Sequence, residues 1–428
     1  MDKNANLTIG ENTFALNILE GTESEKALDI SLLRKQSKFI TFDDGYGNTG
    51  SCESRVTFID GDQGILRYRG FDITELATNS NFLETSYLVI YGELPTASEI
   101  DLFQERISKY AKLPDEVISA INAQPKNSHP MGVLAAGLHA LGGAYPDFCT
   151  NNRKADLERF DDSAALIIST MRTIAATRHR FLLNEEVPDF DSAERYCKNF
   201  LSMMFAKDSV SEEMPDSVVN ALDLIFLLHA DHEQNCSTST CRMIASGGAN
   251  PFASLAGGVS ALWGPLHGGA NMAVIGMLNQ IHDAGDDGSR FIESAKLGKT
   301  RLMGFGHRVY RNYDPRAKIL KAACDNALEA LGVSSPILEI ARRLEEEALK
   351  DPYFVERKLY PNVDFYSGII LQALGFPTDM FTVLFAIGRT PGWLAHWKEI
   401  AETGKKIHRP RQIYQGSTLR PYLSVEKR

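Results

Sequence analysis

The hydrophobic pattern of this chain changes its period once, near residue 70, and that change constrains the fold more than any other feature. Before it, Phe14, Leu16 and Ile18 alternate with small or polar neighbours, the period-two pattern of a half-buried strand. From Ile73 onward, apolar residues recur at helical spacing almost throughout. The sequence therefore predicts a mainly α protein with a small β-rich region at residues 1–70.

Local turn and cap signals place several elements. Residues 56–66 read as a hairpin around an Asp-Gly-Asp-Gln-Gly turn, and the glycine-rich residues 44–50 as a loop before it. Helices are expected to begin at Asp216, at Pro251 and near Asn271, because proline, asparagine and aspartate favour helix N-termini. At 428 residues the chain is long enough for two or three domains and a sizeable core.

Charge and composition limit the partners. The formal net charge is −10, which disfavours nucleic acid and anionic membranes because their phosphates need clustered Lys and Arg. No apolar run approaches the roughly 18 residues of a membrane span, and the first residues lack a signal core. The six cysteines include no C-x-x-C pair. These features favour a cytoplasmic protein without membrane or nucleic-acid partners.

Four short stretches interrupt the helical pattern with glycine, proline or clustered polar residues and carry ionisable side chains. Catalytic groups often lie on such loops because rigid helices hold them in position. The stretches are His229–Glu233, Gly264–Gly269, Gly304–Arg311 and Pro361–Gly368.

The first stretch resembles a metal cluster, with His229, Asp231, His232 and Glu233 close together. However, its histidines are three residues apart rather than the four of the zinc motif H-E-x-x-H, and no cysteine motif completes a site. We therefore expect no metal. A helical core histidine is the simpler interpretation of either residue, and His232, nearer the polar end, is the better candidate for a ligand contact.

His267 and Asp364 both lie near expected helix starts. The positive end of a helix dipole favours neutral imidazole, which can donate a hydrogen bond to a carbonyl or enolate oxygen, although such a histidine is more often part of a plain turn. Asp364 is either a carboxylate that stabilises its helix or a buried general base. The helix dipole and burial shift its pKa in opposite directions, and the sequence leaves this open.

The third stretch places His307 directly after Gly306, with Arg311 and Arg316 downstream. Glycine lets the backbone pass close to a ligand, and arginines at this distance can bind phosphate or carboxylate oxygens. One G-x-G proves nothing, because glycine also serves plain turns. The complete run through Asp314-Pro315-Arg316 is far more specific.

Taken together, these stretches resemble citrate synthase. The run from Gly304 to Arg316, G-F-G-H-R-V-Y-R-N-Y-D-P-R, is similar to the family signature throughout. The stretches that hold His232, His267 and Asp364 occur in the family's order and spacing, as do Gly388-Arg389-Thr390 and Arg409-Pro410-Arg411. The resemblance covers nearly the whole chain, and the β-rich N-terminus is similar to the longer bacterial type II form.

The resemblance implies a reaction and three catalytic residues. Asp364 would take a proton from the methyl group of acetyl-CoA while His267 donates a hydrogen bond to the thioester oxygen. His307 would polarise the keto carbonyl of oxaloacetate, and the citryl-CoA formed would be hydrolysed to citrate and CoA. This chemistry, the first step of the tricarboxylic acid cycle, needs no metal, and no cofactor is expected because acetyl-CoA is a substrate.

The resemblance also implies the binding residues. Arg316, Arg389 and Arg409 match the family's carboxylate-binding arginines, and His232 matches its substrate-binding histidine. The planar fork of arginine suits a dicarboxylate such as oxaloacetate. Expected contacts to CoA come from Met303, Gly304, Phe305, Gly306 and Arg311.

The implied architecture has two helical domains. A large one would comprise residues 71–271 and 379–428, and a small one residues 272–378. Closure of the small domain after oxaloacetate binds would complete the site and exclude water. In the family the counterpart of Arg409 reaches in from a neighbouring subunit, so at least a homodimer is expected, and type II relatives are often hexamers.

Three departures bear on regulation. Some type II enzymes bind NADH through basic residues and a reactive cysteine, but this chain has Leu166, Thr170 and Ser209 at those places. Weak or absent NADH inhibition is therefore expected.

Two alternatives stay open. One is a 2-methylcitrate synthase that uses propionyl-CoA, because one methylene in a pocket is worth only about 1–3 kcal/mol. The other is an inactive regulator that binds CoA or a dicarboxylate on the same fold.

Overall fold

The structure is a computed structural model that describes residues 4–150, 152–188, 194–206, 214–307, 309–311, 313–332, 336–404 and 406–428. The chain divides into two compact units. One comprises Met1–Glu53 with His408–Arg428, and the other Ser54–Ile407. The expected mainly α class is confirmed, since strands occur only before residue 73 in the described ranges.

The first unit contains an antiparallel sheet in the order β1-β2-β3. Its strands are β1 (Asn4–Ile9), β2 (Asn12–Glu20) and β3 (Lys26–Asp29), followed by α1 (Leu33–Ser37) and, at the C-terminal end, η3 (Val425–Lys427). The strand expected around Leu16 is β2, and Leu16 is its buried residue. The alternation of apolar and polar residues therefore located this strand correctly.

The second unit begins with the expected hairpin. Strands β4 (Thr57–Asp60) and β5 (Ile65–Tyr68) pair antiparallel, with Asp60 opposite Ile65, and the short β6 (Phe71–Asp72) joins β5. The Asp60 carboxylate accepts backbone hydrogen bonds from Asp62 and Gln63, which fixes the turn.

Helices form the rest of the second unit. They are α2 (Ile73–Asn79), α3 (Phe82–Tyr91), α4 (Ala97–Lys109), α5 (Asp115–Asn122), α6 (Pro130–Ala144), η1 (Pro146–Phe148), α7 (Arg153–Glu158), α8 (Phe160–Leu183), α9 (Tyr196–Phe205), α10 (Asp216–His229), α11 (Cys236–Ser246), α12 (Pro251–Leu262), α13 (Ala270–Asp283), α14 (Ser289–Lys296), α15 (Pro315–Leu331), α16 (Pro336–Lys350), α17 (Pro352–Glu356), α18 (Val363–Ala373), η2 (Thr378–Met380) and α19 (Phe381–Thr403). The three helix starts expected from the sequence are those of α10, α12 and α13.

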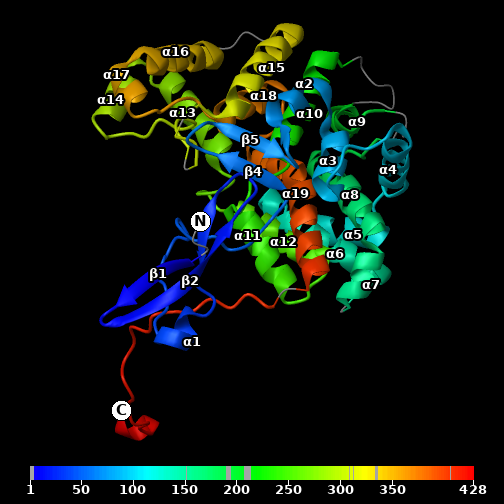
Figure 1. The fold of residues 1–428 in the computed structure, drawn as a ribbon. Helices are drawn as coiled ribbons and strands as arrows, with labels where there is room; N and C mark the ends of the chain where they lie inside the picture. Colours follow the sequence, from blue (N-terminus) through cyan, green and yellow to red (C-terminus); the bar gives the residue numbers. More distant parts are fainter. Residues whose placement is uncertain are drawn as a thin grey trace. The chain divides into compact units, whose positions relative to one another are not determined.

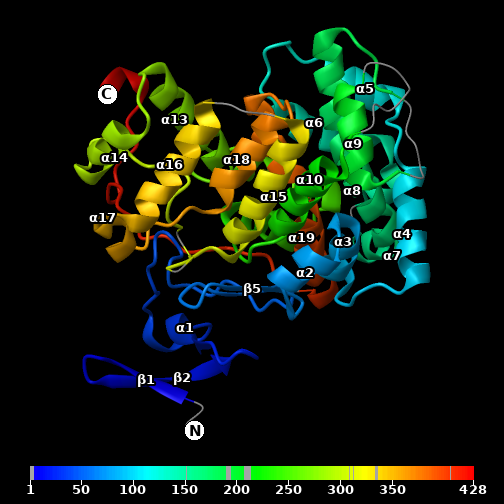
Figure 2. The same cartoon turned by 90° about the horizontal axis from the view of Figure 1, so that it is seen from above.

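Within this unit the helices gather in two groups. Helices α13, α14, α16 and α17 lie at one side, and α4, α5, α7 and α8 at the other, in both views (Figures 1 and 2). Helix α15 packs against both α10 and α18. The division into a large and a small domain at residues 271 and 378 stays a prediction.

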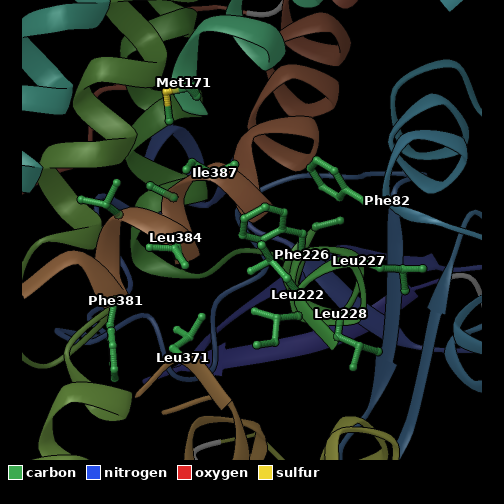
Figure 3. Packing of buried hydrophobic residues seen from close by; sticks show 14 of the residues in the cluster. Phe82, Met171, Leu222, Phe226, Leu227, Leu228, Leu371, Phe381, Leu384 and Ile387 are labelled. Atoms are coloured by element: carbon green, nitrogen blue, oxygen red, sulfur yellow. The ribbon is translucent and has the colours of Figure 1, made fainter. Parts of the chain in front are cut away.

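Helix α19 runs through the centre of the second unit, and α3, α8, α10, α11 and α12 all pack against it. Its two tryptophans, Trp393 and Trp397, are fully buried. Figure 3 shows apolar side chains of α10, such as Phe226, meeting Leu384 of α19 and Leu371 of α18 in one cluster. This packing holds the end of α10, the start of α18 and the middle of α19, where several candidate site residues lie. In the described ranges, no helix has the length and apolar character needed to cross a membrane.

Candidate active site

Two loops far apart in the sequence are tied together at the site. Gly306 N–H donates to the carbonyl of Tyr360, and Asn362 N–H donates to the carbonyl of Gly304, each at 2.8 Å. The Asn362 side-chain amide also donates to the carbonyl of Gly306 at 2.8 Å, while its oxygen caps α18 by accepting from Asp364 N–H. Gly304 and Gly306 both have positive φ, which makes this close approach possible. The loop before His307 therefore lies beside the start of the helix that carries Asp364.

His307 is half-buried, and its tautomer is defined by its neighbours. Its Nδ1 accepts hydrogen bonds from the backbone N–H groups of Val309 and Tyr310, at 3.0 and 3.2 Å. The proton of the neutral ring must then sit on Nε2. Burial and the positive charge of Arg316 lower the pKa of His307 to about 4. At neutral pH this imidazole is an uncharged donor.

His267 lies in the turn before α13 and is also half-buried. Its Nε2 accepts from the backbone N–H of Ser237 at 3.1 Å and lies 2.9 Å from the Ser237 hydroxyl. The ring proton is therefore on Nδ1. Burial, reinforced by Arg389, lowers the pKa of His267 to about 4. Like His307, it offers a single neutral N–H.

Asp364 occupies the first turn of α18 and is half-buried. Burial raises the pKa of its carboxyl to about 6, even though Arg316 and Arg389 oppose the shift. The sequence left open whether burial or the helix dipole prevails, and burial does. A carboxylate with a pKa near 6 is a stronger base than an ordinary aspartate and is still mostly ionised at neutral pH.

Arg316 is buried and held by Asp314, the N-cap of α15. Its Nε and Nη2 donate to the two oxygens of Asp314, both at 3.0 Å. Burial would lower the pKa of Arg316, but Asp314 outweighs it and raises the pKa above its usual value. Asp314 also accepts from Val363 N–H at 3.4 Å, so this pair joins the starts of α15 and α18.

Arg389 projects from the middle of α19 and is 1% exposed. Its Nε donates to the carbonyl of His229 at 2.5 Å, and its guanidinium lies 4.9 Å from the ring centre of Phe385. Burial lowers its pKa to about 10, so it stays charged at neutral pH. Its Nη1 is buried without a hydrogen-bond partner in the described residues, which leaves a donor for a ligand.

His232 follows α10 and is 9% exposed. Its Nε2 lies 3.2 Å from the hydroxyl of Tyr310, and its ring centre lies 5.4 Å from that of His307. Burial and nearby Arg316, His307 and Arg389 hold the pKa of His232 well below its usual value. His229, in contrast, donates from Nδ1 to the carbonyl of Ile225 inside its own helix, so it is a core histidine as the simpler interpretation had it.

Arg316 and Arg389 affect the pKa values of the other candidate residues in the second unit. Arg316 acts electrostatically on His232, His307 and Asp364. Arg389 acts on His232, Asp364 and also His267, which it reaches beside the shared ring of Phe385. Asp364 and His232 therefore feel both arginines, whereas His307 feels Arg316 and His267 feels Arg389.

The candidate CoA contacts lie in and after the same loop. Phe305 packs edge-on against Phe365 with ring centres 5.0 Å apart, and Met303 N–H points to the sulfur of Met277 at 3.2 Å. Arg311 is exposed, with its backbone N–H bound to Gly61 and its side chain 3.7 Å from Asp62. An exposed guanidinium can also bind a phosphate.

The remaining candidates lie elsewhere. Arg409 is exposed and belongs to the first unit, so its expected role stays a prediction. Leu166 and Thr170 are fully buried in α8, and Ser209 lies outside the described residues. Among described residues, no group of three or more His, Cys, Asp or Glu side chains is arranged to hold a metal ion.

The sequence interpretation missed the residues that support the candidates. Ser237 sets the tautomer of His267, Asp314 holds Arg316, Tyr310 contacts His232, and Asn362 ties the two loops. Asp314 and Tyr310 could have been named from the sequence, because both belong to the run 304–316. Nothing in the sequence alone connects Ser237 with His267, since that contact spans thirty residues.

A poised carboxylate, two neutral N–H donors and buried arginines define a class of enzyme. Such a site removes a proton next to a carbonyl, stabilises the resulting oxyanion and holds an anionic partner. The sequence places the chain within that class: residues 45–411 match the family described as citrate synthase, C-terminal domain.

Curated relatives agree over the full length. The chain is 46% identical to citrate synthase 1 of Mycobacterium tuberculosis over 430 residues, covering 100% of this chain and 99% of the relative. It is 47% identical to the citrate synthase of Corynebacterium glutamicum over 419 residues, covering 97% and 95%. The chain belongs to the citrate synthase family.

Solved structures share the fold. The citrate synthase of Pyrobaculum aerophilum superposes with a TM-score of 0.82 at 34% identity, covering 96% of this chain and 97% of that one. The enzyme of Thermoplasma acidophilum, solved as a ternary complex with carboxymethyl coenzyme A and oxaloacetate, gives a TM-score of 0.79 at 32% identity, covering 90% and 99%.

Proposed function

We propose that this chain is a citrate synthase that condenses acetyl-CoA with oxaloacetate and hydrolyses citryl-CoA to citrate and CoA. The observation that carries the proposal is the protonation pattern of the site. One carboxylate has a pKa near 6, and two imidazoles with pKa values near 4 each keep one N–H available. Proton abstraction from a weak carbon acid needs this combination of a base and a neutral donor.

In the first step Asp364 takes a proton from the methyl group of acetyl-CoA. The negative charge that develops on the thioester oxygen is stabilised by the Nδ1–H of His267. Because Ser237 fixes the other ring nitrogen as an acceptor, the donor is already oriented before the reaction begins. A neutral imidazole suits this role, because its N–H can donate a hydrogen bond to the oxygen on which the charge develops.

In the second step the enolate carbon attacks the keto carbon of oxaloacetate. The Nε2–H of His307 polarises the keto oxygen, and its orientation is set by the two backbone N–H groups on Nδ1. As the new carbon–carbon bond forms, the keto oxygen becomes an alkoxide that takes up one proton through His307, and the product is citryl-CoA. Water then cleaves its thioester to release CoA and citrate. The protein forms no covalent intermediate in this scheme.

The carboxylates of oxaloacetate are bound by Arg316, Arg389 and His232. The partnerless Nη1 of Arg389 supports this assignment, because a buried donor is costly until a ligand satisfies it. The loop Met303–Gly306 and Arg311 hold CoA in the proposal, and Arg409 completes the oxaloacetate site from a neighbouring subunit of at least a homodimer.

The test is CoA release by the purified chain. With acetyl-CoA and oxaloacetate we expect release of CoA and one equivalent of citrate, and with acetyl-CoA alone almost none. CoA release independent of oxaloacetate, or none at all, would contradict the proposal and favour a binding protein. Parallel assays with propionyl-CoA separate a 2-methylcitrate synthase, which would prefer that acyl group.

A further inference from the structure

Asp231 has no part in the proposed reaction, yet its side chain is fully buried directly beside His232. A buried carboxylate is strongly unfavourable unless hydrogen bonds and opposite charges compensate it. We propose that the buried hydrogen-bond series Arg242–His396–Asp231 positions His232 and Arg389 to bind oxaloacetate. This inference rests on the proposed function.

The hydrogen bonds of this series are donated in one direction, from Arg242 to His396 and from His396 to Asp231. Arg242 Nη1 donates to His396 Nδ1 at 2.8 Å and to Glu399 Oε2 at 2.9 Å. Because a guanidinium only donates, Nδ1 of His396 is an acceptor and its proton sits on Nε2. That nitrogen faces Asp231, 3.3 and 3.4 Å from its two oxygens. Arg242 thereby fixes the tautomer in which His396 donates to Asp231.

Asp231 in turn holds the backbone around His232. Its Oδ2 accepts from the N–H of Glu233 at 3.2 Å, and its carbonyl accepts from the hydroxyl of Tyr68 at 3.0 Å. Glu233 has φ of 51°, a left-handed conformation that a non-glycine residue adopts only when its surroundings impose it. The carboxylate of Asp231 is therefore one of the groups that keep this turn in shape.

Helix α19 provides the support behind the turn. Gly392 N–H donates to the carbonyl of Ala230 at 3.0 Å, and a Cβ on Gly392 would collide with that carbonyl and with the carboxylate of Asp231. Arg389 lies one turn before Gly392 on the same helix. The turn that carries His232 and the helix that carries Arg389 are thus fitted together at Asp231.

Charge connects Asp231 to Arg389 as well. Burial would raise the pKa of Asp231, but His396 and Arg389 outweigh it and hold the pKa below its usual value. Reciprocally, Asp231 opposes the effect of burial on Arg389. The carboxylate therefore helps to keep both oxaloacetate-binding groups in place, one through the backbone and one through charge.

A matched pair of variants tests the link between His396 and Asp231. His396→Asn keeps an acceptor near the position of Nδ1 but is too short to reach Asp231, whereas His396→Gln can place its amide N–H near the position of Nε2. We expect His396→Asn to raise KM for oxaloacetate about tenfold, the loss of roughly one hydrogen bond to a charged group. His396→Gln should stay within about threefold of wild type, and KM for acetyl-CoA should stay within about twofold in both.

The split between the two substrates separates positioning from simple destabilisation, which lowers the amount of active enzyme without changing one KM. Equal KM values for oxaloacetate in His396→Asn and wild type, or equal increases in both variants, would overturn the inference. If His396→Asn does not fold, Asp231→Asn is the second variant, since it keeps the shape and removes a buried charge. It should also raise KM for oxaloacetate about tenfold, and an unchanged KM would overturn the inference too. A wild-type enzyme that makes no citrate would instead refute the proposed function.

Discussion

The carboxyl of Asp364 is the group whose protonation the proposed reaction depends on most directly. Its environment contains a conflict, because two arginines favour the ionised form while burial disfavours it, and burial prevails. The result is a base that is mostly ionised, and therefore able to accept a proton, at pH values above about 6. Burial lowers the pKa of His267 and His307 to about 4, so both are neutral donors at neutral pH.

This environment predicts the pH dependence of the reaction. Since the pKa of Asp364 is about 6, kcat/KM should fall about tenfold per pH unit below that value, as one proton is taken up. The histidines, with pKa values of about 4, should add no second loss until the pH approaches that value. Initial rates from pH 5 to 8 test this, and a plateau that extended below pH 5 would contradict the assignment.

Asp364→Asn should lower turnover by about 10²–10⁴-fold and at the same time stabilise the fold. The folded pKa lies above the ordinary 3.8, so the folded chain binds the proton more tightly and stability falls as pH rises from about 4 through 6. At pH 7.5 the substitution should therefore gain about 1–3 kcal/mol, and the gain should shrink at pH 5. Thermal unfolding at both pH values measures it.

The control for that experiment is Asp379→Asn, which removes the same charge from an exposed position in η2. It should change neither turnover nor melting temperature appreciably. If Asp364→Asn melted below wild type at pH 7.5, or kept near-wild-type turnover, the description of Asp364 as a general base whose ionised form is destabilised by burial would be wrong.

At the level of residues, candidates could be named from the sequence, but little of their chemistry could be predicted. His232, His267, His307 and Asp364 were all named from motifs, and the structure places them within reach of Arg316 or Arg389. The direction of the Asp364 shift depends on the depth of burial, which only the fold determines. The tautomers depend on contacts such as Ser237 with His267, for which no sequence pattern exists.

Elements were predictable where a local signal marks them. The N-cap asparagine and the proline at residues 250–251 start α12 as expected, because capping is decided by neighbours in the chain. The tie between residues 304–306 and 360–362 was not predicted, since it joins segments more than fifty residues apart. That tie is what brings His307 toward the helix of Asp364.

The Asn362 side chain both caps α18 and bonds to Gly306, and its importance can be compared with that of an ordinary helix cap. Asn362→Ala loses the cap of α18 and the bond to Gly306, whereas Asn250→Ala loses only the cap of α12. Asn250→Ala should cost about 1 kcal/mol of stability, and Asn362→Ala about 1–2 kcal/mol because it also loses the second bond. Only Asn362→Ala should also lower kcat, by about tenfold or more, because a small displacement of a catalytic group is costly. Equal kcat values in the two variants would show that the bond from Asn362 to Gly306 is not needed for catalysis.

Helix α8 bears on regulation by NADH. Its residues Leu166 and Thr170 are fully buried, and the Thr170 hydroxyl donates to the carbonyl of Leu166 at 2.6 Å. Neither offers a cation to a phosphate of the nucleotide. Activity should therefore persist in sub-millimolar NADH when acetyl-CoA is not saturating. Strong inhibition in that range would mean that this chain binds NADH through other residues.

For the whole molecule, the chain divides into two compact units, while the large and small helical domains expected from the sequence stay a prediction. The N-terminal sheet and the C-terminal segment form one unit, and the helical body another. Periodicity locates elements but cannot assign the last twenty residues to the same unit as the first fifty, because that depends on contacts across the full length. Arg409 lies in this terminal unit, so its role is best tested by asking which subunit it serves.

Arg409→Ala alone should weaken oxaloacetate binding strongly, because a substrate carboxylate loses its partner. If Arg409 acts across a homodimer, co-expression with Asp364→Asn should restore activity, since one site of each mixed dimer then has both residues. With random pairing about half of the dimers are mixed, which gives about a quarter of wild-type activity. Co-expression of Arg316→Ala with Asp364→Asn is the matched control and should restore none, because both residues belong to one subunit's site. No recovery in the first pair would place Arg409 in the same subunit as Asp364, and the proposed composite site would have to be abandoned.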